Sequence, residues 1–187
     1  MKHLSLAKPH LVVTVGIPGS GKSFFAEKFA TTFGAPYVCY EKLAQLVNGE
    51  VSSALLMQLD ELLKTKQSVI YDGPSESRAS RSELAKKARE AGYTVLYVWV
   101  QTDQTTAKTR YSQAHKSVSE DEYEKGVKRF TPPNTIEKAL VISGKHTYAT
   151  QAKVVLKRLS TPRTEISGHQ KAPLRTDRPT GRNIIVR

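Results

Sequence analysis

Residues 16–23 read GIPGSGKS and match the pattern G-x-x-x-x-G-K-[ST] at every fixed position. Glycines in such a loop let the backbone wrap closely around an anion and point successive N–H groups inward. Lys22 can reach the β- and γ-phosphates of a nucleotide, and Ser23 can offer its hydroxyl to Mg²⁺. The pattern therefore predicts a site for ATP and Mg²⁺. The predicted nucleotide-binding residues are Gly16, Gly19, Ser20, Gly21, Lys22, Ser23 and Phe24.

A second group suited to this chemistry is the carboxylate of Asp72, which ends the apolar run SVIYD (68–72). An acid at the carboxyl end of a buried strand beside a phosphate loop is placed to hold Mg²⁺, directly or through water. The following Gly73 and Pro74 leave a second interpretation open, in which Asp72 only starts a turn. With the loop present, we predict the metal role for Ser23 and Asp72 together.

The elements that would position these groups alternate along the chain. Five apolar runs have the length of strands, and most are continuous, as in parallel strands covered by helices on both faces. They lie at residues 11–15, 37–40, 68–72, 94–100 and 139–143. Helical patterns separate or follow them at residues 23–33, 51–66, 81–92 and 149–159, the last with Val154, Val155 and Leu159 on one face. The order predicts a doubly wound α/β domain.

The 187 residues suffice for one domain, which we place at residues 1–160. Residues 103–133 are polar and charged, and we expect them to form a helical lid over the site. From Thr161 the composition changes to three prolines, six Lys or Arg and two acidic residues. We expect residues 161–187 to be a basic, disordered tail.

The overall charge is strongly positive, with 29 Lys and Arg against 17 Asp and Glu, a formal net charge of +12. Such a chain attracts polyanions, so a nucleic acid is a possible partner besides the nucleotide. No apolar run approaches the roughly 20 residues that a membrane helix needs, and the start lacks a signal-peptide pattern. With Cys39 as the one cysteine, a cytoplasmic location is expected.

Four segments together resemble the small P-loop kinases, in particular the polynucleotide-kinase-like branch that includes zeta-toxin-like kinases. The resemblance covers residues 11 to about 160. Its segments are GIPGSGKS, YDG with Arg81 in the next helix, GYTVLYVWVQT followed by AKTR, and RFTPPNTIE. It implies a parallel five-stranded sheet in the order 2-3-1-4-5, ATP and Mg²⁺ as cofactors, and transfer of the γ-phosphoryl group to a hydroxyl.

One departure from the family concerns the general base, which is usually an Asp just after the second strand. Here that stretch reads YVCYEKLAQL, and Glu41 is the nearest acid. A carboxylate near the attacking hydroxyl is what the chemistry demands, so Glu41 can serve. Alternatively, Glu41 is only a helix-start residue favoured by the helix dipole.

Cations are needed where phosphoryl transfer spreads negative charge over the γ-phosphate oxygens. We expect Arg110 to supply this charge from the lid. Lys116 and Arg129 could help, although a solvated helix face is the favoured interpretation for both. Arg78 and Arg81 could clamp a substrate phosphate near Asp72.

Taken together, the motifs and the resemblance predict an ATP-dependent phosphotransferase. The resemblance and the net charge of +12 together favour a nucleic-acid 5′-hydroxyl as the acceptor. One alternative is a kinase for a small molecule such as a nucleoside or a nucleotide-sugar. Another is an ATP-binding, RNA-associated regulatory module without kinase activity, in which Glu41 is inert.

Overall fold

The computed structural model describes residues 6, 8–115 and 120–160. Lys116 and the predicted tail at 161–187 lie outside the described residues. Within the described part, no helix has both the length and the apolar character needed to cross a membrane.

The centre of the molecule is a five-stranded sheet whose paired strands are all parallel. The strands are β1 (His10–Val15), β2 (Tyr37–Cys39), β3 (Val69–Asp72), β4 (Thr94–Gln101) and β5 (Leu140–Ser143). Their order is β2-β3-β1-β4-β5, so the predicted doubly wound P-loop NTPase sheet in the order 2-3-1-4-5 is confirmed. All five predicted strands are present within a residue or two of the expected bounds.

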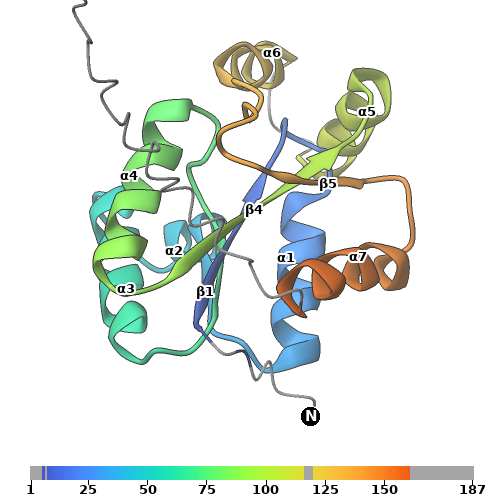
Figure 1. Ribbon diagram of the computed structural model, residues 1–187. Coiled ribbons are helices and arrows are strands. Elements are labelled where there is room, and N and C mark those ends of the chain that lie inside the picture. Colours follow the sequence, from blue (N-terminus) through green and yellow to red (C-terminus); the bar gives the residue numbers. More distant parts are fainter. Residues whose placement is uncertain (1–5, 7, 116–119, 161–187) are drawn as a thin grey trace, which may run out of the picture.

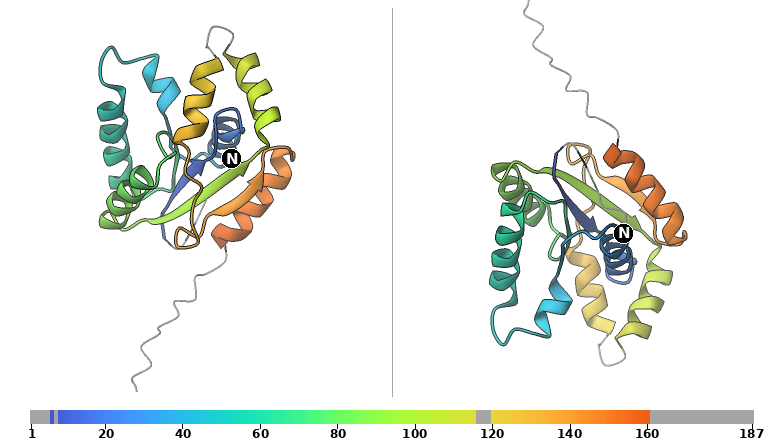
Figure 2. Two further views of the ribbon diagram at one scale, coloured as in Figure 1. Left: turned by 90° about the horizontal axis from the view of Figure 1, so that it is seen from above. Right: turned by 90° about the horizontal axis from the view of Figure 1, so that it is seen from below.

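Helices cover both faces of the sheet (Figures 1 and 2). On one face lie α1 (Lys22–Phe33) and α7 (Tyr148–Ser160), and on the other lie α3 (Val51–Lys64) and α4 (Arg78–Glu90). The short α2 (Tyr40–Ala44), which the sequence analysis did not predict, follows β2 directly. The predicted lid segment contains α5 (Gln104–Ala114) and α6 (Glu120–Arg129).

The central strand β1 explains why the strands read as continuous apolar runs. Leu11, Val13 and Val15 pack into the core on the α3 and α4 side, whereas Val12 packs with Phe25 and Phe29 of α1 on the other side. All of these side chains are fully buried. Successive residues of a strand point to opposite faces, so a strand covered on both sides must be apolar throughout.

The parallel arrangement brings the carboxyl ends of the strands to one edge of the sheet. The loops after β1, β3, β4 and β5 therefore emerge together at that edge, and α5 and α6 lie beyond it, at the top of Figure 1. This edge is where ligands bind in open α/β sheets, and it carries the predicted phosphate loop.

Candidate active site

The phosphate loop runs from β1 to α1 and adopts a backbone that favours glycine at Gly16, where φ is 152°, and at two positions further on. Gly19 has a φ of 72° and Gly21 a φ of 100°, both in the left-handed region that L side chains rarely adopt. Gly21 directly precedes α1, whose first N–H groups are unpaired by the helix itself and can point at an anion. The loop therefore has the strand, turn and helix context that phosphate binding needs.

Both helices of the lid segment lie directly on this loop. A Cβ added to Gly19 would be 2.1 Å from the carbonyl oxygen of Ala107 in α5, and one added to Gly126 in α6 would be 2.6 Å from Cγ of Pro18. Contacts this close exist only because each position lacks a side chain.

Gly16 and Ser20 are two predicted loop residues that are buried. The Ser20 carbonyl accepts a hydrogen bond from Oγ1 of Thr102 at 2.9 Å. Thr102 follows β4, so the loop is held from the neighbouring strand as well as from its own.

The Lys22 side chain is partly buried, and its Nζ donates a hydrogen bond to the carbonyl oxygen of Ile17 at 2.9 Å. Burial lowers the pKa of Lys22, while the nearby charges of Asp72, Glu41 and Glu76 act in the opposite direction. Lys22 and these three carboxylates line the same cavity. The bond to its own loop is one that phosphate oxygens can replace.

The Asp72 carboxylate ends β3 and is 7% exposed. One oxygen accepts a hydrogen bond from Oγ1 of Thr14 at 2.9 Å, and the other accepts one from the hydroxyl of Tyr37 at 3.1 Å. Burial, assisted by the charge of Asp72, raises the pKa of Tyr37 far above its usual value, so this hydroxyl stays a donor. Strands β1 and β2 thus orient the acid that β3 supplies.

A cavity of about 620 Å³ opens in front of the loop. Its volume lies in the range of pockets that hold ligands of nucleotide size. Lys22, Ser23 and Phe24 line it from the loop, and Asp72 lines it from the end of β3. Five of the seven predicted loop residues, Gly19, Gly21, Lys22, Ser23 and Phe24, therefore share one cavity with Asp72.

Two further carboxylates line the same cavity. Glu41 is exposed and stands in the first turn of α2. Glu76, which the sequence analysis missed, is partly buried in the loop between β3 and α4, and its Oε2 accepts a hydrogen bond from the backbone N–H of Ser75 at 3.0 Å. Its signal in the sequence was an acid four residues beyond Asp72, in a loop leaving the carboxyl edge of the sheet.

The lid segment contributes cations to the cavity. Arg110 lines it from α5, and its Nη1 donates a hydrogen bond to the carbonyl oxygen of Gly144, beyond β5, at 2.9 Å. Arg129, for which the sequence favoured a solvated helix face, lies on the cavity wall at the end of α6 and is exposed. Positive charge therefore reaches the cavity from both helices.

The predicted substrate clamp is not formed. Arg81 is fully buried, and its guanidinium makes a bidentate ion pair with Glu137, with Nε to Oε1 at 2.6 Å and Nη2 to Oε2 at 3.2 Å. Arg78 is exposed but lines a different pocket, between α4 and the start of β4. Arg81 is thus a buried structural cation, because its guanidinium is taken up by Glu137, 56 residues further along the chain.

A family model described as "AAA domain" (AAA_33) matches residues 11–133, which include the phosphate loop, Asp72 and the lid segment. The chain belongs to this family. No curated protein sequence matches it.

Several solved structures are similar to this AAA-domain protein. A gluconokinase from Sinorhizobium meliloti 1021 has a TM-score of 0.61 at 16% identity, over 81% of this chain and 91% of its own. Kti12 from Chaetomium thermophilum, in complex with ADP-AlF3, has a TM-score of 0.59 at 16% identity, over 79% and 96%. A chain of the Pnkp1/Rnl/Hen1 RNA repair complex has a TM-score of 0.56 at 20% identity, over 67% and 45%.

Likeness at this level of identity concerns the fold. The fold of this protein is that of the P-loop kinases, and together with the complete loop it implies nucleotide binding.

Proposed function

We propose that this protein is an ATP-dependent phosphotransferase that moves the γ-phosphoryl group of ATP to a hydroxyl acceptor. The observation that carries the proposal is one cavity that is lined by the phosphate loop, by three carboxylates and by two arginines of the lid segment. Phosphoryl transfer is catalysed mainly by positioning and electrostatic stabilisation, and this cavity contains the groups for both.

The loop N–H groups and Lys22 bind the β- and γ-phosphates in this proposal. Arg110 and Arg129 stabilise the charge that spreads over the γ-phosphate oxygens during transfer. Arg110 is already near the loop, because it belongs to the helix that packs against Gly19. Arg129 belongs to α6, which packs against Pro18.

The cavity also has donors suited to Mg²⁺. Ser23 and Asp72 supply a hydroxyl and a carboxylate, the hard oxygen ligands that Mg²⁺ takes together with substrate phosphates. The Asp72 oxygens are already oriented by Thr14 and Tyr37. When bound, the ion would neutralise charge on the transferred phosphate.

The general base is assigned to Glu41. Its carboxylate lies on the cavity wall without burial, so it can accept the proton of an incoming hydroxyl. Glu41 thereby takes the role that the polynucleotide-kinase-like family gives to an Asp at this place in the chain.

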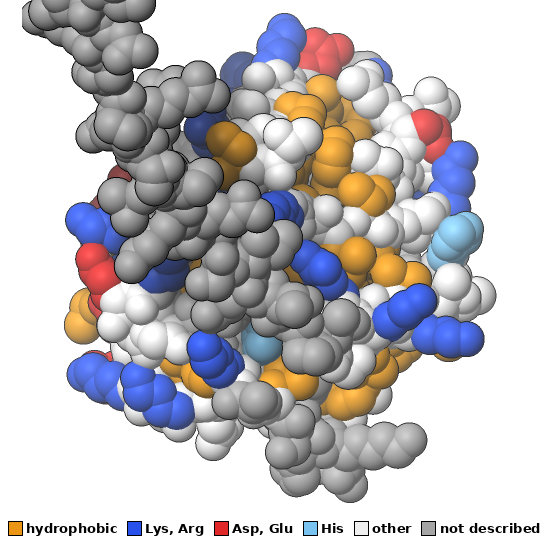
Figure 3. Space-filling model, viewed as in Figure 1, with side chains coloured by type: hydrophobic (Ala, Val, Ile, Leu, Met, Phe, Trp, Pro, Cys, Tyr) orange, Lys and Arg blue, Asp and Glu red, His pale blue; other side chains and the backbone are white. Residues whose placement is uncertain are grey.

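The preferred acceptor is a nucleic-acid 5′-hydroxyl. The net charge of +12 favours an extended polyanion, and Lys and Arg side chains are scattered over the face in Figure 3 while Asp and Glu are few there. The similar chain from an RNA repair complex points the same way. A small-molecule acceptor is the second candidate, because the similarity to a gluconokinase extends over more of both chains.

Transfer of labelled γ-phosphate from ATP tests the proposal on three acceptors: a 5′-hydroxyl oligonucleotide, a nucleoside and a sugar acid. We expect the oligonucleotide to be labelled fastest. Glu41→Gln should lower the rate by about 10²–10⁴-fold, the usual contribution of a general base. Glu90→Gln, which changes an exposed Glu at the end of α4, is the matched control.

Preferential labelling of the sugar acid or the nucleoside would replace the nucleic-acid acceptor by a small molecule. Tight ATP binding without transfer to any acceptor would contradict the phosphotransferase and favour the regulatory module.

A further inference from the structure

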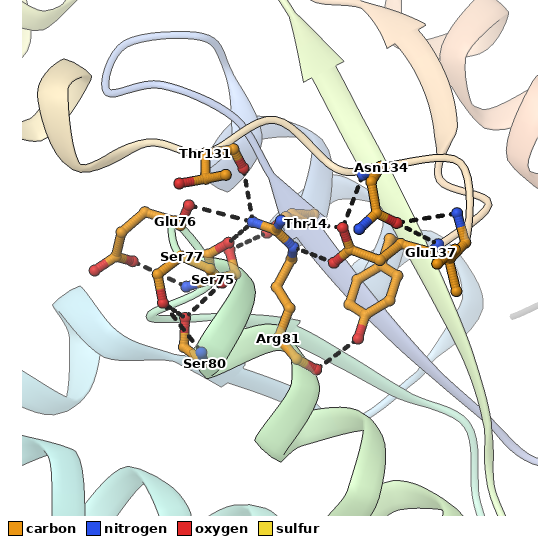
Figure 4. A network of polar contacts seen from close by, with 11 residues as sticks. Thr14, Ser75, Glu76, Ser77, Ser80, Arg81, Thr131, Asn134 and Glu137 are labelled. Atoms are coloured by element: carbon orange, nitrogen blue, oxygen red, sulfur yellow. Dashed lines mark hydrogen bonds and ion pairs between the residues drawn. The ribbon is translucent and has the colours of Figure 1, made fainter.

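Arg81 is the centre of a buried polar network that joins segments far apart in the sequence (Figure 4). Its Nη1 donates hydrogen bonds to the carbonyl oxygens of Ser75 at 2.9 Å, Glu76 at 3.2 Å and Thr131 at 3.0 Å. Its other two nitrogens pair with Glu137. One guanidinium therefore binds the loop after β3 and the chain that leaves the lid segment.

The residues that follow α6, Phe130 and Thr131, are called the lid exit below, and a second bond ties them to the β3–α4 loop. The backbone N–H of Thr131 donates to the carbonyl oxygen of Glu76 at 2.8 Å. Thr131 stands two residues after Arg129, which lines the cavity at the end of α6. The position of the lid exit is therefore linked to that of the loop that carries Glu76.

The network also reaches the metal-ligand candidate. Oγ of Ser75 donates to the carbonyl oxygen of Thr14 at 2.7 Å, and the Thr14 side chain holds Asp72. Thus the same loop that Arg81 binds also contacts the strand leading into the phosphate loop. Glu76, Asp72 and Arg129 all line the cavity. Arg81 bonds the Glu76 carbonyl directly, reaches Asp72 through Ser75 and Thr14, and bonds Thr131, two residues after Arg129.

Glu137 is itself held in place for this pairing. Its Oε2 accepts a hydrogen bond from the backbone N–H of Asn134 at 2.8 Å, and the Asn134 side chain accepts in return from the N–H of Glu137 at 3.0 Å. The Tyr97 hydroxyl donates to the Arg81 carbonyl at 2.6 Å. The geometry of the guanidinium is therefore set from several sides.

We propose that Arg81, held by Glu137, is a positioning residue that couples the lid exit to the part of the cavity wall formed by Asp72 and Glu76. It sets where the lid arginine Arg129 stands relative to the carboxylates Asp72 and Glu76. The planar guanidinium donates in fixed directions, so a lysine, which is a point charge, cannot hold all these segments at once. The proposal rests on the phosphotransferase function for its kinetic consequence and on the fold alone for the coupling.

Three variants test the coupling. Arg81→Lys keeps the charge but loses the fork, Glu137→Gln keeps the shape but loses the ion pair, and Ser75→Ala cuts only the link to Thr14. The control is Lys87→Gln. Lys87 lies on the same helix as Arg81, and its ion pair with Asp60 of α3 at 2.7 Å lies outside the network. Ser75→Ala leaves the buried ion pair intact, so it remains informative if Arg81→Lys does not fold.

The chain contains its own reporter of the lid exit. Trp99 is the only tryptophan, and its ring centroid lies 6.2 Å from that of Phe130, the residue between Arg129 and Thr131. Its emission on titration with ATP reports the lid exit and requires no acceptor. Turnover, KM for the acceptor, ATP affinity and melting temperature are measured on the same preparations.

In the unaltered protein and in Lys87→Gln, ATP should change the Trp99 emission. In the three variants ATP should still bind, the emission change should be reduced or lost, and kcat should fall by up to about 10²-fold, the effect of a misplacement of about 1 Å. An unaltered protein without an emission change, or variants that respond and turn over like the control, would overturn the coupling. Loss of ATP affinity in parallel with kcat would also overturn it, because the network would then act on the phosphate loop. Absence of turnover with every acceptor would defeat the phosphotransferase, and the Trp99 response would still decide the coupling.

Discussion

The close contact between the phosphate loop and α5 makes Gly19→Ala a sensitive test of the structure. The new Cβ would stand 2.1 Å from the carbonyl oxygen of Ala107, 2.9 Å from its carbonyl carbon and 3.1 Å from Cβ of Tyr111. The first two atoms are backbone, so no rotation of a side chain relieves the contact. Either α5 moves away from the loop or the loop changes its conformation.

The cost has two parts. An L residue at the left-handed φ of 72° costs about 1–2 kcal/mol, and a change of 1 kcal/mol shifts the melting temperature of a domain this size by about 2–4 °C. The backbone angle alone therefore predicts a decrease of about 2–8 °C. Displacement of α5 adds to this decrease and also moves Arg110 of the same helix away from the cavity.

Gly92→Ala separates the two parts. Gly92 has a similar φ of 81°, but its nearest neighbour to an added Cβ is the flexible Nζ of Lys66 at 4.0 Å. Calorimetry without nucleotide should show a larger fall in melting temperature for Gly19→Ala than for Gly92→Ala. Equal decreases would refute the tight packing of α5 on the loop.

Four other changes have defined outcomes. Lys22→Ala should abolish productive ATP binding and leave the far-ultraviolet circular dichroism unchanged; unaltered affinity would contradict its role. Asp72→Asn should weaken Mg²⁺-dependent turnover more than metal-free nucleotide binding, and an unchanged Mg²⁺ titration would return Asp72 to a turn-forming role. Burial raises the pKa of Glu137, but hydrogen bonds from Arg81 and Asn134 outweigh it and hold the pKa below the ordinary 4.5, so the ion pair stabilises the fold fully above pH 4.5 and less as pH falls through the folded pKa. Glu137→Gln should therefore lower the free energy of unfolding at neutral pH and make acid unfolding less steep. An unchanged acid-unfolding profile would contradict the pairing. Truncation after Ser160 removes six basic and two acidic residues and should flatten the salt dependence of oligonucleotide binding, by about 0.7 log units per log salt for each phosphate of a single strand that these residues neutralise; an identical slope would show that the removed segment neutralises none.

Several features of the site were predictable because their signals are local. The pattern GIPGSGKS combines glycines for the turn with Lys22 and Ser23 at fixed spacing, and the structure places the loop between a strand and a helix. Asp72 was predictable because the end of a continuous apolar run marks the carboxyl edge of a parallel sheet. On α7, by contrast, Val154 was expected on the buried face but is 38% exposed, since Val155 and Leu159 there pack with Ala152 instead.

The amino-acid sequence by itself determined the strands of the sheet and the phosphate loop, because strand burial and loop glycines depend on neighbouring residues, whereas the order of the strands was expected only from the resemblance to the P-loop kinases. Only the tertiary structure decided which charged side chains face the cavity. Glu76 and Arg129 line it, whereas Arg81 is buried against Glu137 and Arg78 lies in another pocket. The physical reason is that the position of a charged side chain depends on its partners. The ion-pair partner of Arg81, Glu137, and the carbonyl of Thr131 come from a chain segment 50–56 residues away that no local pattern brings near it.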